Sequence, residues 1–419
     1  MKNLRGKLIF IMSVVLFLMA LALVAVRVPA PAAAAAKPEA INIGWLGDMS
    51  GPVSSLSKQH FMMSSLYFDY INKKGGIDGV KIKMVTTDTH YKAPRVISEF
   101  KRLMRQKPRP LAILTLSSHD TETIKDRYEK KKVPVIANSG SIPAEYPPGW
   151  VFTPWPTYAH CACAFVNYYL EKIWPAKGMD RKPRFAWLTW DNAYGRAPMI
   201  LTNKYLAKKG LKVVATEFTA IRAVDTTAEL MRLKKAGADV ILSNINAGPY
   251  SVIMKDAVRL RLKEKLDFYD GYFGAGDEFL NAAAGAGDGH YVAFPHELMS
   301  ETSVPGIALM NKLQMDYHGK VVDDMCCFGG FSGAILAVDA IKAAVAKKGW
   351  PITGADVYEE VRSLKDYDPM GICPPLSFGE RRYGHTKVYI ATAKGNKYVK
   401  VAPEYVDCPA LDLADHFKK

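Results

Sequence analysis

The chain has 419 residues, of which 49% are hydrophobic and 23% charged, and its formal net charge is +15. This balance is ordinary for a soluble globular protein, and it excludes an intrinsically disordered chain and a membrane protein with many spans. Because the length exceeds what one hydrophobic core usually serves, we expect two lobes.

The N-terminus has the pattern of an export signal. Three basic residues within the first seven positions precede an apolar run, Leu8–Val26, and an alanine tract, Ala32–Ala36. This order is typical of a secretory signal peptide, which we predict over residues 1–36 with cleavage after Ala34 or Ala36. The apolar run is also close to the roughly 20 residues that span a bilayer, so an uncleaved N-terminal membrane anchor is the alternative. Either interpretation places the remaining chain outside the cytoplasm, and we expect it in the periplasm.

The net positive charge of the chain indicates which classes of partner it can attract. Residues 1–36 carry four basic residues and no acidic one, so their removal leaves a net charge of +11. Such a balance can attract nucleic acid, anionic lipid or anionic solutes. The lysines and arginines are spread along predicted helices and interleaved with acids, however, as at Lys125, Arg127 and 130–132. This pattern is typical of a solvated surface, and no basic stripe or motif favours nucleic acid as a partner.

Residues 39 onward alternate strand-like and helix-like segments. The apolar run Ile41–Gly47 predicts a buried first strand, and the helical spacing of Phe61–Ile71 predicts a helix that stops at the pair Gly75-Gly76. The next predicted elements are a strand at Val80–Thr87, a helix at Pro94–Arg105, a strand at Leu111–Leu116, a helix at Thr121–Lys131 and a strand at Pro134–Ala137.

A second set of elements follows the extended stretch Phe152–Pro156, where two prolines forbid helix. The predicted helices are Ala162–Trp174, Ala197–Lys209, Thr227–Lys235, Tyr250–Leu260, Val304–Tyr317 and Gly333–Ala346. The predicted strands are Phe185–Trp190, Lys212–Phe218, Val240–Asn244, Phe268–Phe273, Pro375–Phe378 and Val388–Thr392. A second extended stretch, Tyr291–Pro295, is expected to cross back to the first lobe.

This alternation predicts an α/β fold of two lobes, each a doubly wound parallel sheet, joined by a hinge of several segments. We assign residues 39–154 and 292–374 to the first lobe, and residues 155–291 and 375–419 to the second. The cleft between two hinged lobes is then the expected ligand site.

Signatures of catalysis and metal binding are missing from the sequence. It contains no G-x-S-x-G elbow, P-loop, H-E-x-x-H or EF-hand loop, so we do not expect an enzyme. Cys161 and Cys163 stand two apart in a predicted helix and do not share a face, and no zinc-finger spacing occurs, so we expect neither a metal nor another cofactor. Six cysteines leave disulfide pairing open, with Cys373–Cys408 as one hypothesis.

Serines stand at two predicted strand ends. Ser117-Ser118 follow one strand and precede a helix, while Ser139 and Ser141 follow the next strand. Hydroxyls and free N–H groups at such junctions can hold an anion, because helix N-termini carry partial positive charge. Plain helix capping explains the same serines equally well.

At these junctions the sequence resembles the leucine/isoleucine/valine-binding protein family, the type I periplasmic binding proteins of ABC transporters. The likeness runs in order along nearly the whole chain after residue 36. The matching stretches are Ile43–Pro52, Asp69–Gly79, Ala112–Ser118, Val133–Ser141, Asp191–Gly195 and Lys235–Val240, then Leu376–Phe378 with Val388–Ile390.

The resemblance implies two α/β lobes that close on a ligand and present it to a membrane permease. In this family the residues matching Ser118, Ser139 and Ser141 hold a ligand carboxylate. The tyrosine matching Tyr194 packs over the ligand from the second lobe. Members are usually monomers, which we expect here too.

The chain also departs from the family. Amino-acid-binding members place an acid near the end of the strand at Phe268–Phe273, where Tyr272 stands here, with Asp277 and Glu278 a few residues on. An unpaired ammonium in a closed cleft costs several kcal/mol, so the resemblance favours a carboxylate with an apolar or aromatic body over a free amino acid.

Aromatic residues Trp155, Tyr158 and Tyr272 would line the pocket with Tyr194, although such rings serve lobe packing as often. Asn246, two residues beyond Val240–Asn244, completes the expected ligand-binding set. The alternatives to a transport receptor are a ligand sensor of the same fold outside the cytoplasm and an exported enzyme.

Overall fold

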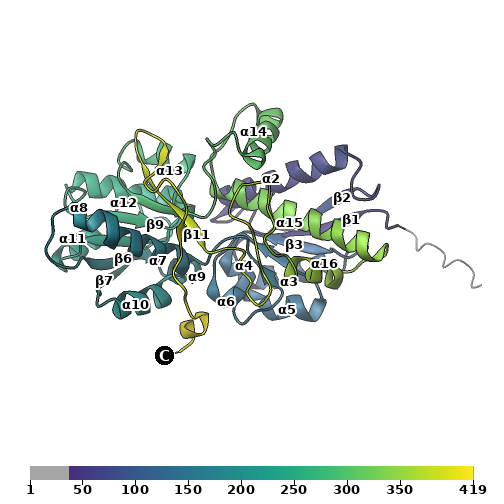
Figure 1. The fold of residues 1–419 in the computed structure, drawn as a ribbon, viewed down its shortest axis with the longest axis horizontal. Helices are drawn as coiled ribbons and strands as arrows, with labels where there is room; N and C mark the ends of the chain where they lie inside the picture. Colours follow the sequence, from purple (N-terminus) through teal and green to yellow (C-terminus); the bar gives the residue numbers. More distant parts are fainter. Residues whose placement is uncertain (1–36, 419) are drawn as a thin grey trace, which may run out of the picture. The chain divides into compact units, whose positions relative to one another are not determined.

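The computed structural model describes residues 37–418, and the chain from Pro38 onward forms one compact unit with two β-sheets (Figure 1). The signal peptide predicted for residues 1–36 lies outside the described residues.

The first sheet has five parallel strands in the order β2-β1-β3-β4-β5. Its strands are β1 Ile41–Leu46, β2 Ile82–Thr86, β3 Ala112–Thr115, β4 Val135–Ala137 and β5 Val151–Phe152. Every residue of β1 is buried, as expected for a central strand covered by helices on both faces.

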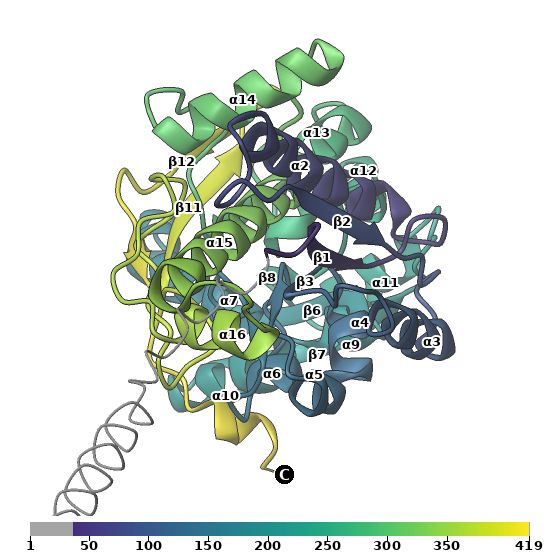
Figure 2. The ribbon, with the colours of Figure 1, turned by 90° about the vertical axis from the view of Figure 1, so that its right-hand side faces the viewer.

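The helices associated with the first sheet are α2 Ser54–Lys73, α3 Ala93–Leu103, α4 Ser118–Thr123, α5 Lys125–Lys131, α6 Ile142–Glu145, α15 Met325–Lys348 and α16 Gly354–Arg362. Side chains of β1 point to both faces of the sheet. Ile43 and Trp45 pack in one hydrophobic cluster with α2 and α15, whereas Leu46 packs in a second cluster with α3 and α5. Helices α2 and α15 lie side by side (Figure 2), and Ser64 Oγ of α2 donates to the Gly330 carbonyl of α15 at 3.0 Å.

The second sheet has eight strands, in the order β12-β11-β10-β9-β8-β6-β7, with β13 also paired to β11. Its strands are β6 Arg184–Trp190, β7 Lys212–Thr219, β8 Val240–Ser243, β9 Asp267–Asp270, β10 Tyr291–Phe294, β11 Lys387–Ala393, β12 Tyr398–Lys400 and β13 Val406–Asp407. The strands from β6 to β10 are parallel, and β11 to β13 add an antiparallel edge.

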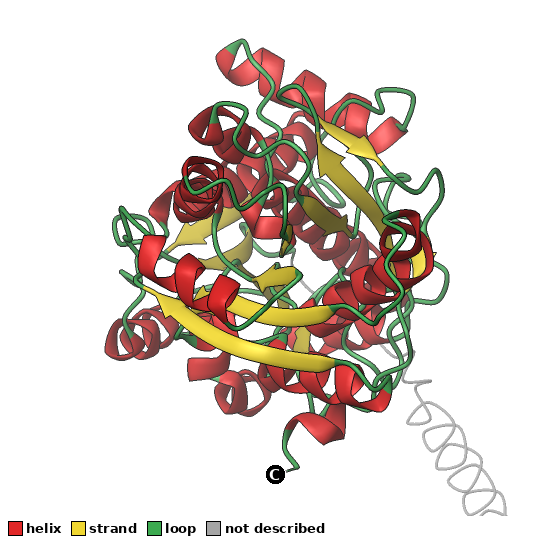
Figure 3. Cartoon of the chain, turned by 90° about the vertical axis from the view of Figure 1, so that its left-hand side faces the viewer, coloured by secondary structure: helices red, strands yellow, loops and turns green. Residues whose placement is uncertain are grey.

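Helices lie on both sides of this sheet (Figure 3). The remaining helices are α7 Tyr158–Tyr168, α8 Trp174–Ala176, α9 Ala193–Arg196, α10 Met199–Lys208, α11 Thr227–Lys235, α12 Ala247–Arg259, α13 Asp277–Ala283 and α14 Pro305–His318.

The chain passes between the two sheets more than once. All strands up to residue 152 lie in the first sheet, and those from 184 lie in the second. Helices α15 and α16 return to the first sheet before β11 joins the second. The α/β class with two mainly parallel sheets is therefore confirmed, while the lobe ranges 39–154, 292–374, 155–291 and 375–419 stay predictions. Strand β10, at the start of 292–374, pairs within the second sheet.

Several predicted elements are corrected. The helix expected at Thr121–Lys131 is two helices, because Ile124 leaves the helical region with φ −131° and ψ 18°. The helix expected from Ala162 begins at Tyr158, because the Thr157 side chain accepts from the backbone N–H of His160 and caps it. The segment 375–378 is not a strand, since only Leu376 makes an isolated bridge, with Tyr367.

Helix α15 is, among the described residues, the one helix long and apolar enough to cross a membrane by length and composition. Its apolar window is 78% buried inside the fold, and it packs on α2 and α16. These properties are those of the central core helix of a globular unit.

Candidate ligand-binding site

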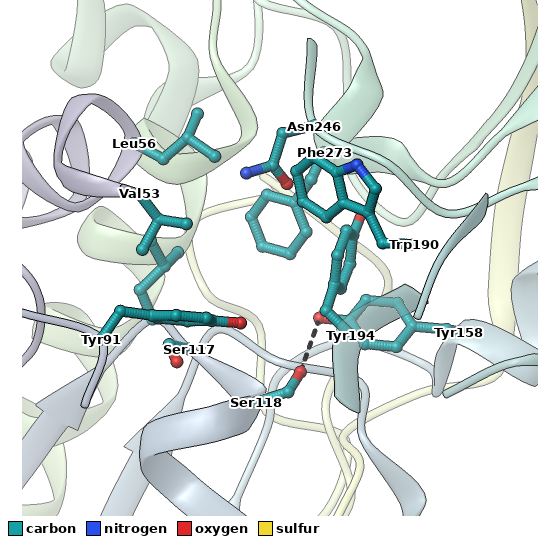
Figure 4. A pocket seen from close by; sticks show the side chains of 11 residues that line it. Val53, Leu56, Tyr91, Ser117, Ser118, Tyr158, Trp190, Tyr194, Asn246 and Phe273 are labelled. Carbon is teal, nitrogen blue, oxygen red and sulfur yellow. Dashed lines mark hydrogen bonds between the residues drawn. The ribbon is translucent and has the colours of Figure 1, made fainter. Parts of the chain in front are cut away.

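A pocket lies where the carboxyl ends of strands from both sheets meet (Figure 4). It contains about 370 Å³ of space free of protein atoms, part of it open to solvent. From the first sheet side it is lined by Val53, Leu56, Tyr91, Leu116, Ser117 and Ser118, and from the second by Tyr158, Trp190, Tyr194, Asn246 and Phe273. The carboxyl ends of parallel strands are where α/β folds bind their ligands.

Hydroxyl groups form one part of the pocket wall. Ser118 Oγ lies 2.9 Å from Ser139 Oγ and 3.5 Å from the Tyr158 hydroxyl, and either partner can donate in both pairs. Ser117 Oγ accepts from the Asp120 backbone N–H at 3.0 Å and caps α4. Burial raises the pKa of Tyr158 to about 12, so this hydroxyl stays protonated and can donate to an anion.

Aromatic rings form most of the remaining wall. The five are Tyr91, Tyr158, Trp190, Tyr194 and Phe273. Tyr194 is central, with ring centroids 5.3 Å from Tyr158, 5.8 Å from Phe273 and 6.2 Å from Trp190. Because these contacts are edge-on, ring faces and edges remain for a flat or apolar ligand body.

The pocket has no ionised side chain in its wall. Of the described residues, no Asp, Glu, Lys, Arg or His lines it. A ligand charge would therefore be met by hydroxyls, the Asn246 amide and the backbone N–H groups at the start of α4 and α12.

The structure brings four of the eight predicted residues to the pocket. Ser118, Tyr158, Tyr194 and Asn246 line it. Their part in ligand binding stays a prediction.

The other four predicted residues lie behind the wall. Ser139 is 1% exposed and reaches the pocket only through its hydrogen bond to Ser118. Ser141 donates its hydroxyl to Glu122 Oε1. Trp155 is fully buried, and its indole N–H donates to Asn138 Oδ1 at 2.5 Å.

Tyr272 is displaced by the way its strand ends. Strand β9 stops at Asp270, and Tyr272–Gly274 forms a 3₁₀ turn. This turn buries the Tyr272 side chain completely, 5.4 Å from the Tyr158 ring, and the next residue, Phe273, lines the pocket instead.

The acids considered as counter-charges for an ammonium also lie outside the wall. Asp277 Oδ2 accepts from the Asp323 backbone N–H at 2.9 Å, and Glu278 does not line the pocket. Asp270, the acid that ends β9, is fully buried and accepts from the Ile245 backbone N–H at 3.0 Å. Burial raises the pKa of Asp270 well above its ordinary value, which favours the neutral acid.

Sequence reasoning gave no ligand role to several lining residues. Trp190 ends β6, so its place after a predicted strand could have marked it. Tyr91 follows β2 in a loop with φ 55°, a conformation that no hydrophobic period reveals. Val53 and Leu56 enter from the start of α2, directly after the first strand.

Cysteines and metal ligands form no further centre in the described part of the chain. All six cysteines are buried free thiols, so the hypothetical Cys373–Cys408 disulfide is not formed. No group of three or more His, Cys, Asp or Glu residues within 37–418 could hold a metal ion.

Comparisons with known proteins give the fold and the family. A structure from Thermus thermophilus, described as a branched chain amino acid ABC transporter with bound valine, superposes with a TM-score of 0.79 at 23% identity, covering 88% of this chain and 96% of that one. A fatty acid ABC transporter substrate-binding protein from Thermomonospora curvata gives 0.76 at 21% identity, covering 87% and 92%. A solute binding protein from R. palustris in complex with benzoate gives 0.74 at 17% identity, covering 89% and 98%. These likenesses show the predicted type I periplasmic binding protein fold.

A relative from Brucella suis, Leu/Ile/Val-binding protein homolog 7, is 29% identical over 206 residues, or 48% of this chain. The chain spans about half the length of this relative, 51%. Residues 40–397 match the profile of the family described as periplasmic binding protein. This family consists of binding proteins rather than enzymes, and its members lie outside the cytoplasm, as the N-terminal sequence predicted. The chain therefore belongs to the periplasmic binding protein family.

Proposed function

We propose that this protein is the solute-binding receptor of an ABC importer, and that it captures a carboxylate with an aromatic or apolar body in the pocket at Ser118 and Tyr194. The observation that carries the proposal is the composition of the wall, which combines hydroxyls at a strand end with five aromatic rings and no ionised side chain. The closed form would then deliver its ligand to a membrane permease, and we expect the receptor to act as a monomer.

The wall supports an acid over an amino acid. Ser118, Tyr158 and the N-terminus of α4 offer donors to a carboxylate. Among the described residues, no carboxylate lines the pocket to meet an ammonium, whose desolvation without a partner costs several kcal/mol. Relatives of this fold are described with valine, with a fatty acid transporter and with benzoate, so the fold accommodates either class.

Matched pairs of ligands test this choice. We would measure the melting temperature of residues 37–419 with 3-phenylpropanoate against phenylalanine, 4-methylpentanoate against leucine, and benzoate against benzamide. Within the first two pairs the molecules differ only by the ammonium, and within the third by the carboxylate charge. A ligand at 100 times its Kd stabilises the folded state by about 2.7 kcal/mol, which is measurable.

We expect the deaminated acids to raise the melting temperature more than their amino acids, and benzoate more than benzamide. The reverse order in the first two pairs would overturn the ligand class and revive Asp277 or Glu278 as the counter-charge. Equal shifts with benzoate and benzamide would overturn the carboxylate.

Delivery is tested separately from binding. Deleting the gene should abolish uptake of the labelled ligand by cells, because a receptor supplies the permease. Unchanged uptake in the deletion strain would favour the alternative, a sensor of the same fold, while turnover of the ligand by purified protein would favour an exported enzyme.

A further inference from the structure

Two adjoining surface hollows lie at the opposite strand ends of the first sheet from the ligand pocket. The first contains about 1200 Å³ of space free of protein atoms, part of it open solvent, and is bordered by Ile41, Leu111 and Val133, which stand at or just before the amino ends of β1, β3 and β4. The second contains about 1000 Å³ of such space, again partly open solvent, and shares Met104, Arg109, Lys130 and Lys131 with the first. The two hollows therefore form one surface, lined by residues of α3, α5 and the start of α16, and Figure 2 shows these three helices.

This surface is strongly basic. Seven cations line the two hollows, and we call them the basic face: Lys101, Arg105, Arg109, Arg127, Lys130, Lys131 and Lys132. All seven side chains are exposed, and no Asp or Glu lines either hollow among the described residues. The ion pair of α3 belongs to Arg102, outside the face, which bonds Glu99 at 2.7 Å.

The charge of the whole protein is concentrated here. Residues 93–132 contain eleven Lys and Arg against five Asp and Glu, a net charge of +6 out of the +11 that remains after residue 36. The helices hold this charge outward, because α3 buries Val96, Phe100 and Leu103 while Lys101 and Arg102 stay exposed. The acids interleaved with these cations in the sequence, Asp126 and Glu129, are exposed on α5 but line neither hollow.

The chain also enters the compact unit at this place. Pro38 and Ala40 line the larger hollow beside Arg109 and Lys130–Lys132. The sequence before them is the predicted signal peptide or membrane anchor of residues 1–36. If that segment is a retained anchor, the chain joins it through Pro38, which lines the same hollow as Arg109 and Lys130–Lys132.

We propose that the basic face binds the surface of an anionic phospholipid bilayer. Its cations are spread over an exposed surface rather than gathered in an enclosed site, which suits a layer of phosphate headgroups. Pro351, which is exposed, also lines the larger hollow and adds apolar contact. Trp350 beside it is half-buried, and its indole N–H donates to Asp78 Oδ2 at 2.9 Å.

Vesicle sedimentation tests the proposal. Residues 37–419 would be mixed with vesicles of phosphatidylcholine alone and of phosphatidylcholine with one third phosphatidylglycerol, in about 0.1 M and about 1 M salt. The test variant is Arg109→Gln with Lys130→Gln and Lys131→Gln, the three cations common to both hollows. The control variant is Lys234→Gln with Lys235→Gln and Lys255→Gln, three exposed lysines on α11 and α12.

We expect the unmodified chain to sediment with the phosphatidylglycerol vesicles only, and to be released in the higher salt. Each cation near an anionic surface contributes about a five-fold factor, so the test variant should bind at least about 10-fold more weakly while the control keeps its binding. Equal losses in both variants would assign the binding to net charge alone and overturn the basic face. So would absence of binding by the unmodified chain. Melting temperatures of all three proteins, with and without the ligand found in the panel, verify that folding and the pocket are intact.

Discussion

Ser118 is the hydroxyl best placed to meet a ligand carboxylate, because it lies in the pocket wall between Ser139 and Tyr158. We predict that Ser118→Ala weakens binding of the carboxylate found in the panel by about 10-fold or more, since a hydrogen bond to a charged group contributes about 1.5–3 kcal/mol. Isothermal titration calorimetry measures this change. Ser98→Ala, an exposed serine on α3, is the control and should bind as the unmodified chain does. Unaltered affinity in Ser118→Ala would remove this serine from the site.

Asp120 gives a second prediction at this scale, on pH. It is fully buried at the base of α4, and burial together with the nearby Asp48 raises its pKa to about 7 from 3.8. The folded state therefore keeps a proton that the unfolded state releases above about pH 4. The contribution of Asp120 to the free energy of unfolding is greatest below the pKa that Asp120 has in the unfolded state. This contribution falls by up to about 4 kcal/mol as the pH rises towards 7. We predict that Asp120→Asn removes this loss.

Urea unfolding between pH 4 and pH 8 measures the Asp120 effect. The free energy of unfolding of Asp120→Asn, taken relative to that of the unmodified chain, should rise as the pH increases across this interval. Other buried groups affect both proteins alike. Burial also raises the pKa of Asp323 to about 7, and it lowers the pKa of His60 and His160 to about 3, so the histidines' contribution to stability rises with pH. Asp126→Asn, at an exposed position on α5, is the control. Parallel curves for Asp120→Asn and the unmodified chain would contradict the prediction.

At the scale of elements, the contact of α15 with α2 depends on a glycine. A Cβ at Gly330 would lie 2.3 Å from the carbonyl oxygen of His60 in α2, so the two helices would have to separate. A Cβ at Gly333, one turn further along the same helix, would meet Leu114 and Ile136 at 3.5 and 3.6 Å, which is ordinary contact. We predict that Gly330→Ala destabilises the fold by about 1–3 kcal/mol, whereas Gly333→Ala is neutral or stabilising by up to about 1 kcal/mol.

Thermal and urea unfolding of these two variants check the α15 prediction, and each serves as the control for the other. Both substitutions add one methyl to one helix and improve its helix propensity equally, so the difference between them reports only the approach of α2. Equal free energies of unfolding in the two variants would contradict the prediction, because α2 would then move away from the added methyl at His60 without an energetic cost.

Much of this element structure was predictable because buried parallel strands read as short apolar runs. The first strand, expected at Ile41–Gly47, is Ile41–Leu46, and the helix at Thr227–Lys235 has the predicted bounds. The errors are local in origin. The break at Ile124 carries no proline or glycine signal, and the end of β9 at Asp270 instead of Phe273 decides which of two adjacent rings enters the pocket.

The site was predictable only in part, because local changes in backbone direction without a sequence signal also decide which side chains line the pocket. Ser118 and Tyr194 came from the family pattern, and both line the pocket. Tyr91 comes from a loop whose backbone turns through positive φ, and Phe273 is aimed by a 3₁₀ turn. Neither conformation produces a periodic hydrophobic pattern in the sequence. The sequence alone therefore could not show that these two rings line the same pocket.

At the scale of the whole molecule, the packing of the fold buries every cysteine. All six thiols are buried, and burial raises the pKa of each, to about 12 for Cys163. The reactive thiolate is therefore scarce and inaccessible in the folded state. We predict that the native chain takes up no iodoacetamide near pH 8, and that the chain unfolded in guanidinium without a reductant takes up six labels, counted by mass spectrometry.

The comparison of native and unfolded labelling also decides how the cysteines exist after export. Ser98→Cys, which adds an exposed thiol on α3, should gain one label in the native state and so verifies the reagent. Six labels on the unfolded chain would show that packing alone keeps the thiols apart and reduced in an oxidising compartment. Four labels, restored to six by a reductant, would reveal one disulfide that this arrangement of the chain lacks. The two cysteines of that disulfide would identify the segment that moves, because the Cα atoms of disulfide-bonded residues lie within about 7 Å of each other.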